Sequence, residues 1–363
     1  MKHVGVWSFV VGVTLLLIVG GCDEGETTGP YPSPRNPADA VYVCNQAEAT
    51  VSIIAPSSQQ VVETVDLTNY GFSSDAKPHH VVVEPDGSAW YVSLIGDDVV
   101  AKFDVRNEIV ATVDFVSPGM LSLHPEADLL YAGHTMSIPD VPSTVAVIQR
   151  SDMTPVSVPL SVPIERPHGM KISPRGDYAY SSSLSANRIV AIDTETQQVQ
   201  APVALPGSHQ FYVQLDITAD GETAYITGDR GNQVHILDLQ HPTTPSFVDS
   251  VSVDGAPWHP QLSEDGSTLY FGSKAANTVN ALETASRDTT TITGTGLAQP
   301  HGSALSPNGR FLYISNNNLN GTYEPSTRDG VGTVVVIDTQ THEIDTVIEV
   351  GEKPTGINTR WHP

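Results

Sequence analysis

The chain has 363 residues, of which 41 are acidic and 17 are basic, so its formal net charge at pH 7 is −24. This acidic balance argues against nucleic acid and anionic lipid as partners, because both are bound by clustered lysine and arginine. No CxxCH haem-attachment site, HExxH motif, P-loop or GxSxG elbow occurs in the sequence, which excludes the enzymes that depend on those motifs.

Residues 1–21 have the layout of an export signal. A basic head at Lys2 is followed by an apolar core over 4–19 and by the sequence VGGC, which ends at Cys22. The core is too short for a membrane-spanning helix and ends at a small-residue cleavage site. The closing residues resemble a bacterial lipobox, which implies a lipidated Cys22 as the first residue of the mature protein. The alternative is an ordinary signal peptide in which Cys22 has no role.

Residues 22–38 are rich in Pro, Gly, Thr and acidic side chains, and the sequence predicts a lipidated Cys22 followed by a flexible linker. Residues 39–363 are then the folded domain. Two or more acyl chains hold a protein stably on a membrane. The predicted location is therefore the bacterial cell envelope, facing the periplasm or the outer surface, with inner and outer membrane both left open.

The folded domain begins with three strand-like segments over 39–67. The first of them contains Cys44 within the apolar run VYVCN at 41–45. With Cys22 lipidated, Cys44 has no disulfide partner. Its neighbours predict a buried small hydrophobic residue rather than a nucleophile.

A repeated pattern fills the rest of the chain: proline and histidine, an apolar run, a turn glycine and a tyrosine. Alternating Val, Ile and Tyr between Gly, Pro and Asp turns predict short antiparallel strands joined by hairpins. The clearest copies begin with KPHH at 77–80, RPHG at 166–169 and QPHG at 299–302. The turn glycines Gly176, Gly221, Gly266 and Gly309 are spaced 45, 45 and 43 residues apart.

Repeats of 40 to 50 residues with four strands each are typical of propeller blades. Residues 39–67 supply three strands of a further unit and residues 352–363 supply the missing one, so pairing of the two ends closes the ring. The sequence thus predicts an all-β, seven-bladed propeller of four-stranded antiparallel blades, monomeric and without long helices. The six complete units start near Lys77, Ser117, Glu165, Ser208, Gly255 and Gln299.

Two segments resemble the repeat of the YVTN family of propellers. They are YVCN at 42–45 with TVSII at 50–54, and YISN at 313–316 with TVVVID at 333–338. The resemblance extends over 39–363 and implies the propeller fold. It implies no single function, because the family includes binding proteins of unknown ligand as well as propeller parts of metal and haem enzymes.

Histidines recur where each unit enters its innermost strand, a point that in a propeller lies at one mouth of the central channel. His79, His168 and His301 stand at one distance from their turn glycines, and His80 and His259 stand one residue later. His209 lies a few residues early, so its position is uncertain. Either each histidine bonds a neighbouring backbone group, or the imidazoles converge and bind copper or another transition metal.

The paired His79 and His80 also resemble the copper-cluster propeller of nitrous oxide reductase, and more distantly the d1-haem propellers. The former uses seven histidine ligands, more than are found here, so reduction of nitrous oxide is not expected. Two functions remain open from the sequence. The first is a binding or scaffold module for an envelope protein or small ligand; the second is a metal-dependent redox enzyme or metal carrier. Metal binding is expected to weaken below about pH 6, where free histidine becomes protonated.

Overall fold

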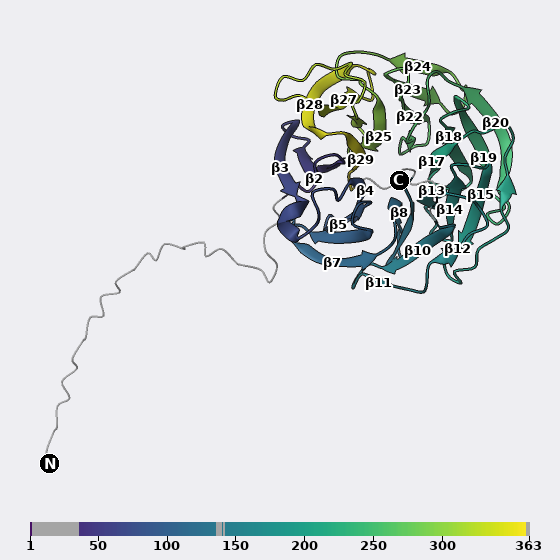
Figure 1. The fold of residues 1–363 in the computed structure, drawn as a ribbon, viewed down its shortest axis with the longest axis horizontal. Coiled ribbons are helices and arrows are strands. Elements are labelled where there is room, and N and C mark those ends of the chain that lie inside the picture. Colours follow the sequence, from purple (N-terminus) through teal and green to yellow (C-terminus); the bar gives the residue numbers. More distant parts are fainter. Residues whose placement is uncertain (2–35, 136–139, 141, 361–363) are drawn as a thin grey trace. The chain divides into compact units, whose positions relative to one another are not determined.

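The computed structural model describes Met1 and residues 36–135, 140 and 142–360. Residues 2–21 of the predicted signal peptide, Cys22 and most of the linker lie outside these residues. Seven antiparallel sheets follow one another around a ring, which confirms the predicted seven-bladed propeller (Figure 1). Among the described residues, no helix has the length and apolar character needed to cross a membrane.

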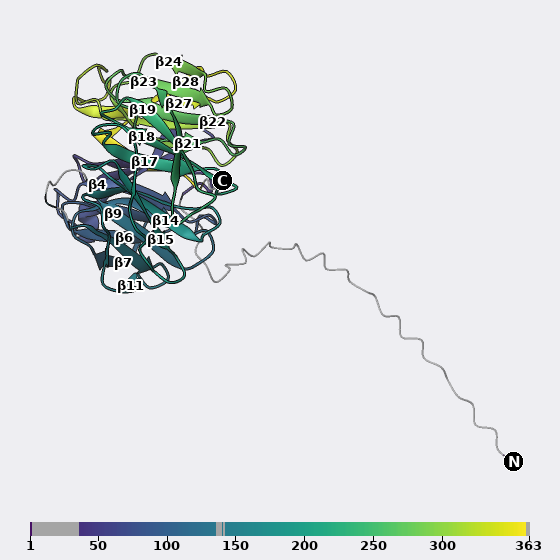
Figure 2. The same ribbon diagram turned by 90° about the vertical axis from the view of Figure 1, so that its right-hand side faces the viewer.

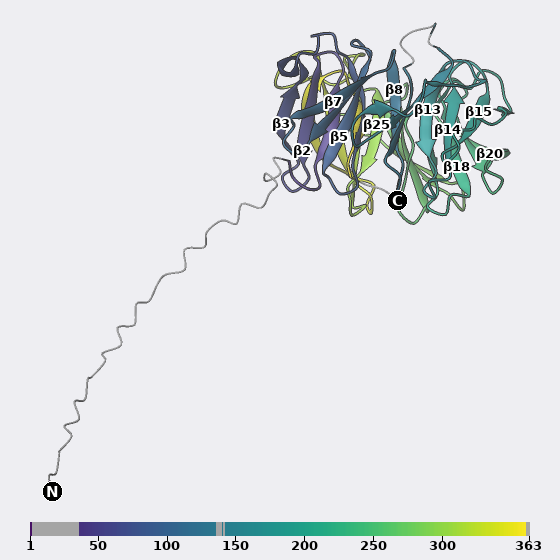
Figure 3. The same cartoon turned by 90° about the horizontal axis from the view of Figure 1, so that it is seen from below.

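One strand of each blade lies nearest the centre of the ring (Figure 1). Figure 3 shows that these innermost strands run across the thickness of the ring. They are β4 (Pro78–Val83), β8 (Pro118–Leu123), β13 (Pro167–Ile172), β17 (Tyr212–Ile217), β21 (Gln261–Leu262), β25 (Pro300–Leu305) and β29 (Pro354–Asn358). The strands paired with them are β5 (Ala89–Leu94), β9 (Leu129–His134), β14 (Tyr178–Ser183), β18 (Thr223–Gly228), β22 (Thr268–Ser273), β26 (Phe311–Asn316) and β1 (Val41–Asn45).

The third and fourth strands complete each blade on its outer side (Figure 1), and Figure 2 shows the same blades from the side. The third strands are β6 (Val99–Asp104), β10 (Thr144–Gln149), β15 (Arg188–Asp193), β19 (Gln233–Asp238), β23 (Thr278–Glu283), β27 (Val331–Asp338) and β2 (Thr50–Ala55). The fourth are β7 (Ile109–Asp114), the short β11 (Thr154–Pro155) and β12 (Leu160–Ser161) beside β10, β16 (Val203–Ala204), β20 (Ser246–Ser252), β24 (Thr289–Ile292), β28 (Ile344–Glu352) and β3 (Gln60–Asp66). The only helical segment described is the one-turn 3₁₀ helix η1 (Leu67–Tyr70).

The ends of the folded domain pair as the sequence predicts. The C-terminal strand β29 forms the inner edge of the sheet β29-β1-β2-β3, with Val43 opposite Ile357. The side chain of Asn45 adds a bond, because its Oδ1 accepts from the backbone N of Gly351 at 3.0 Å. The ring is therefore closed by hydrogen bonds between its two ends, and β29 covers the edge of β1 that would otherwise be open.

Apolar side chains fill the spaces between neighbouring blades. At the seam, Tyr42 contacts Trp90 of the next blade with ring centroids 5.5 Å apart, and Trp90 stacks on Phe103 at 4.2 Å. Cys44 is fully buried in the same cluster, and burial raises the pKa of its thiol far above the usual range. A blade buries its faces only against its neighbours, so the ring is one cooperative core.

The hydrogen-bonded structure begins a few residues before the predicted boundary at 39. Asn36 is buried, and its Nδ2 donates to the Oδ1 of Asn107 at 2.6 Å and to the hydroxyl of Tyr42 at 3.0 Å. The last residues of the predicted linker are thus attached to the first two blades.

Candidate functional site

Each blade enters its innermost strand through the same tight backbone turn, named here the proline step. One residue of this turn is left-handed in all seven blades, with φ between 48° and 63°. In six blades proline follows it and fixes the start of the strand. The seven left-handed residues are Lys77, Ser117, Arg166, Phe211, Ala256, Gln299 and Lys353. They surround one end of the channel, named here the proline mouth.

A register irregularity follows the proline step and explains why adjacent histidines turn toward the channel. In β4 it lies between Pro78 and Val81, the stretch that contains His79 and His80. A bulge suspends the strict alternation of side chains between the two faces of a strand. In the closing blade the second residue after the proline is Gly356, and the neighbouring blade packs directly against it. A Cβ at this position would lie only 2.4 Å from the carbonyl O of His79, so there is no room for a side chain.

Five of the six histidines predicted for the site lie together. The ring centroid of His79 lies 6.1 Å from that of His168 and 6.0 Å from that of His301. The ring centroid of His259 lies 5.0 Å from that of His301 and 6.1 Å from that of His80. These five residues are named here the histidine cluster. Four blades contribute to it, although the residues span more than two hundred positions of sequence.

His209 is not part of the cluster, because its side chain is exposed. In this blade the left-handed residue of the proline step is Phe211, followed by Tyr212 in place of proline. Val213 and Gln214 therefore hold the positions that histidines hold in other blades. The proline-histidine pattern could not be aligned in this unit of the sequence because the proline is missing.

The cluster contains buried nitrogens without partners. Its histidines are at most 8% exposed. Buried polar atoms in folded proteins almost always have a partner, so unpartnered ones require an explanation. Among the described residues, the unpartnered ring atoms are His79 Nδ1, His79 Nε2, His168 Nε2, His259 Nε2 and His301 Nδ1.

Three buried histidines outside the cluster give the contrast. Both ring nitrogens of His134 have partners, the carbonyl O of Val116 at 2.8 Å and the hydroxyl of Thr144 at 2.9 Å. His124 and His235 likewise have partners on both nitrogens. The missing partners are thus a property of the cluster and not of buried histidine in this fold.

Backbone contacts assign the tautomers of two cluster members. The Nδ1 of His168 lies 2.7 Å from the carbonyl O of Val213, which can only accept, so Nδ1 carries the proton and Nε2 keeps a free lone pair. The Nδ1 of His80 accepts from the backbone N of Leu121 at 3.2 Å, so the proton of its neutral ring is on Nε2. The cluster thus offers a ligand both an acceptor and a donor.

Burial keeps these imidazoles neutral. It lowers the pKa of His80 to about 3 and that of His168 to about 4. It also lowers the pKa of His79, His259 and His301 well below 6.5, and neighbouring imidazoles and nearby lysines add to the effect. Neutral imidazole is the form that binds metals and exchanges hydrogen bonds with neutral or anionic groups.

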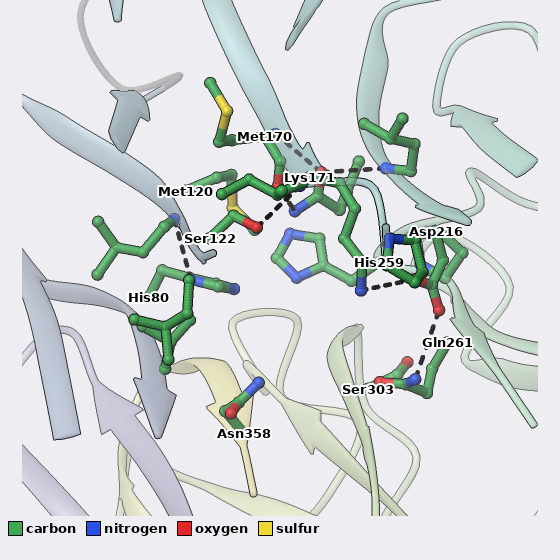
Figure 4. A pocket seen from close by; sticks show the side chains of 18 of the residues that line it. His80, Met120, Ser122, Met170, Lys171, Asp216, His259, Gln261, Ser303 and Asn358 are labelled. Carbon is green, nitrogen blue, oxygen red and sulfur yellow. Dashed lines mark hydrogen bonds and ion pairs between the residues drawn. The ribbon is translucent and has the colours of Figure 1, made fainter. Parts of the chain in front are cut away.

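The channel continues from the cluster as a cavity of about 300 Å³, with His80 and His259 in its lining (Figure 4). On its wall, Nζ of Lys171 lies 2.7 Å from Oδ1 of Asp216, and the other carboxylate oxygen of Asp216 accepts from the backbone N of Leu262 at 2.8 Å. This ion pair joins the innermost strands β13 and β17.

Two further polar atoms of the cavity lining are buried without partners among the described residues, Ser303 Oγ and Asn358 Oδ1. Figure 4 places both residues across the cavity from Met170 and Lys171. With His259 Nε2, blades on different sides of the cavity supply polar atoms that have no protein partner. This is the chemistry of a site that binds a small polar molecule.

The site also includes three residues that were not predicted from the sequence, Trp258, Lys274 and Lys353. Trp258 holds the sequence position of His301 in its own blade, and the two rings lie 4.3 Å apart. Lys274 Nζ lies 3.9 Å from the centre of the Trp258 ring. The repeat register could have found Trp258 and Lys353, since both lie at proline steps, whereas Lys274 follows a second strand and carries no periodic signal.

The donor set suits a transition metal in its chemistry, but the positions do not form a ready site for a single ion. Among the residues that the structure describes, no three His, Cys, Asp or Glu side chains are placed to hold one metal ion. Copper or another transition metal therefore stays a prediction.

Comparison with known proteins supports the fold. No family model and no curated protein sequence matches the chain. A functionally unknown protein from Desulfotomaculum acetoxidans has a TM-score of 0.73 at 17% identity, with 90% of this chain and 99% of the other covered. The periplasmic gluconolactonase PpgL of Pseudomonas aeruginosa has 0.68 at 18%, covering 88% and 98%. Dihydro-heme d1 dehydrogenase NirN in complex with DHE has 0.63 at 15%, covering 91% and 78%. At these identities the similarity shows the propeller fold alone.

Proposed function

We propose that this chain is an exported, lipid-anchored propeller of the bacterial cell envelope that acts as a binding module, with a small polar ligand held in its channel. One observation carries the proposal: five buried imidazole nitrogens of the histidine cluster have no partner among the described residues. Leaving that many polar atoms unpaired costs about 1–3 kcal/mol each, so a bound molecule that pairs with them offsets a large cost.

The chain's own groups define how such a ligand is held. His168 Nε2 accepts a hydrogen bond and His80 Nε2 donates one, which fixes the orientation of a ligand that has both functions. The cavity volume of about 300 Å³ favours a small molecule over a peptide. Ser303 and Asn358 provide further polar contacts at the opposite wall.

The envelope location is supported by the leader over 1–21 and by the small-residue sequence that ends at Cys22. The printed name of one structural neighbour, a periplasmic gluconolactonase, gives a similar fold in that compartment. If the protein acts instead as a scaffold, its partner would be another envelope protein that binds at the proline mouth.

A second candidate is a metal-dependent redox enzyme or metal carrier. Its support is the arrangement at His168, whose Nδ1 donates to a backbone carbonyl while Nε2 keeps its lone pair, as metal-bound histidines do. The unpartnered nitrogens of His79, His168, His259 and His301 are the donors available to a metal, although no three of these side chains are placed to hold one ion together in the described structure. A bound metal would supply Lewis-acid or electron-transfer chemistry. NirN, which has a similar fold, is a dihydro-heme d1 dehydrogenase by its printed name.

Native mass spectrometry tests both candidates. The Cys22→Ser protein, purified from the periplasm without chelators, should carry an additional mass that is lost in the double variant His79→Ala/His301→Ala. His241→Ala, which changes an exposed histidine, is the control and should retain it. Elemental analysis then separates an organic ligand from copper, zinc or iron. A parent without bound mass, or a double variant that keeps it, contradicts the proposal.

A further inference from the structure

The described residues contain five lysines, and three of them have protein partners. Lys77 and Lys171 each form an ion pair with an aspartate, and Lys102 donates to a backbone carbonyl oxygen. Lys274 and Lys353 have no carboxylate within ion-pair distance in the part of the chain that the structure describes. In a protein with 41 acidic residues, two such ammonium groups beside the same channel need an explanation.

Both lysines belong to the proline mouth. Lys353 is the left-handed residue before β29, and the backbone N of Lys274 donates to the carbonyl O of Ala256 in the proline step of its own blade. Their charges act on the cluster, and the charge of Lys353 also acts on Lys274. Burial, neighbouring histidines and then both lysines lower the pKa of His79. Burial lowers the pKa of Lys274 to about 8, and the charge of Lys353 acts in the same direction.

Lys274 is held in place by an aromatic surface. Its Nζ lies 3.9 Å from the centre of the Trp258 ring, and the Nε1 of Trp258 donates to Oδ1 of Asp229 at 2.9 Å. Asp229 is the acidic residue whose charge raises the pKa of Lys274 against the effect of burial. It is already bonded to the indole, so it only partly compensates the ammonium.

We propose that the proline mouth is an oxyanion site, in which Lys274 and Lys353 hold a small phosphate or carboxylate group against the histidine cluster. The inference rests on the proposed function and specifies the chemical class of its ligand. An oxyanion would relieve the repulsion between the two ammonium groups and accept charge-assisted hydrogen bonds from both. Its remaining oxygens would accept from the imidazole N–H groups beneath.

A second pocket beside the proline mouth is less suitable for an anion. Lys77 and Lys353 line a pocket of about 580 Å³, but Asp75, Asp98 and Asp140 line it too. Lys274 is not part of that lining. The oxyanion is therefore placed between Lys274 and Lys353, on the side of His79, rather than in the pocket.

The test is a titration of the Cys22→Ser protein by isothermal calorimetry at constant ionic strength. Inorganic phosphate and sodium acetate are the two probes, and sodium chloride is the reference salt. Phosphate binding should weaken at least about tenfold in Lys274→Met and in Lys353→Met, because each loses one charge-assisted hydrogen bond. Arg106→Met removes the same charge at an exposed turn between β6 and β7 and should bind like the parent. Acetate binding with no phosphate binding would assign the site to carboxylates.

Equal binding of phosphate by the parent and both lysine variants overturns the inference, as does an absence of binding by both probes. Thermal unfolding of each variant checks that it is folded. If the double variant His79→Ala/His301→Ala loses its co-purified mass while lysine variants bind phosphate normally, the proposed function stands and the oxyanion site fails. If phosphate binding depends on the lysines but no ligand depends on the histidines, the oxyanion site stands without the proposed function.

Discussion

Trp258 and His301 lie with ring centroids 4.3 Å apart, although they belong to successive blades. They hold the same position in two copies of one repeat, and the propeller brings equivalent positions of neighbouring blades together. Where the repeat has histidine, the ring adds a nitrogen to the cluster. Where it has tryptophan, the ring forms an aromatic wall that supports Lys274. The same repeat position thus carries different side chains in different blades. One part of the site is therefore lined by imidazoles and another by an indole ring and a lysine.

Stability should fall as the pH drops below about 6.5. The cluster histidines bind protons near that pH when unfolded, whereas burial lowers the pKa of folded His168 to about 4 and that of His80 to about 3. Between these values the unfolded state binds more protons, so the free energy of unfolding rises with pH, by up to about 1.4 kcal/mol per pH unit for each histidine. Urea unfolding at pH 7, 6 and 5 measures the slope.

His168→Gln should reduce that slope by about one histidine's contribution, roughly 1.4 kcal/mol per pH unit. His241→Asn, at an exposed position, should leave it unchanged. A free energy of unfolding that stays constant from pH 7 to 5 would mean that the cluster is charged or solvated in the folded state. The lowered pKa values also predict that the proposed ligand binding persists below the pH of about 6 expected from free histidine, for as long as the ring remains folded.

Removing residues 352–363 should destabilise the whole ring. The deletion takes away β29, the inner strand of the closing blade, and leaves β1 with an open edge. Thermal unfolding should show one transition at a much lower temperature. Ile357→Ala is a milder version: Ile357 is 3% exposed and packs at the seam, so about 3 kcal/mol should be lost in one transition. Unchanged melting of the truncated protein would refute closure by the two ends.

Asp216→Asn should cost about 2–3 kcal/mol of unfolding free energy. The carboxylate is 1% exposed, pairs with Lys171 and accepts from the backbone N of Leu262, so the variant loses charge-assisted hydrogen bonds and leaves an unpaired ammonium at the cavity. The double variant Lys171→Met/Asp216→Asn should regain part of the loss. Urea unfolding of the parent, both single variants and the double variant gives the coupling energy. Strict additivity would argue against a stabilising pair.

Cys22→Ser should abolish membrane attachment. The sequence VGGC predicts a lipidated cysteine at position 22, and lipid is what would hold the mature protein at the envelope. Detergent phase partitioning of cell extracts measures this. Cys44→Ser is the control at the other cysteine, which is fully buried, and it should still partition with the parent. Partitioning of Cys22→Ser into detergent would show that the cysteine is not the anchor.

The sequence predicted most of the fold because the same local sequence pattern recurs from blade to blade. Turn glycines, the proline step and alternating apolar residues each act within a few positions, so blade number and closure follow from counting. The register of His79, His168 and His301 could be found in the same way. His209 was uncertain because its blade lacks the proline that marks the step, and the structure leaves it exposed.

The sequence by itself determined the architecture: seven blades, a closing strand supplied by the C-terminal end, and histidines at matching positions of the innermost strands. Only the tertiary structure decided which of those histidines meet, which ring nitrogen of His80 and of His168 carries the proton, and which nitrogens lack partners. It also decided that Lys274 and Trp258 join Lys353 at the channel. The physical reason is that periodicity specifies contacts within a blade, whereas the chemistry of the channel depends on distances and burial between blades, which arise only when the ring closes.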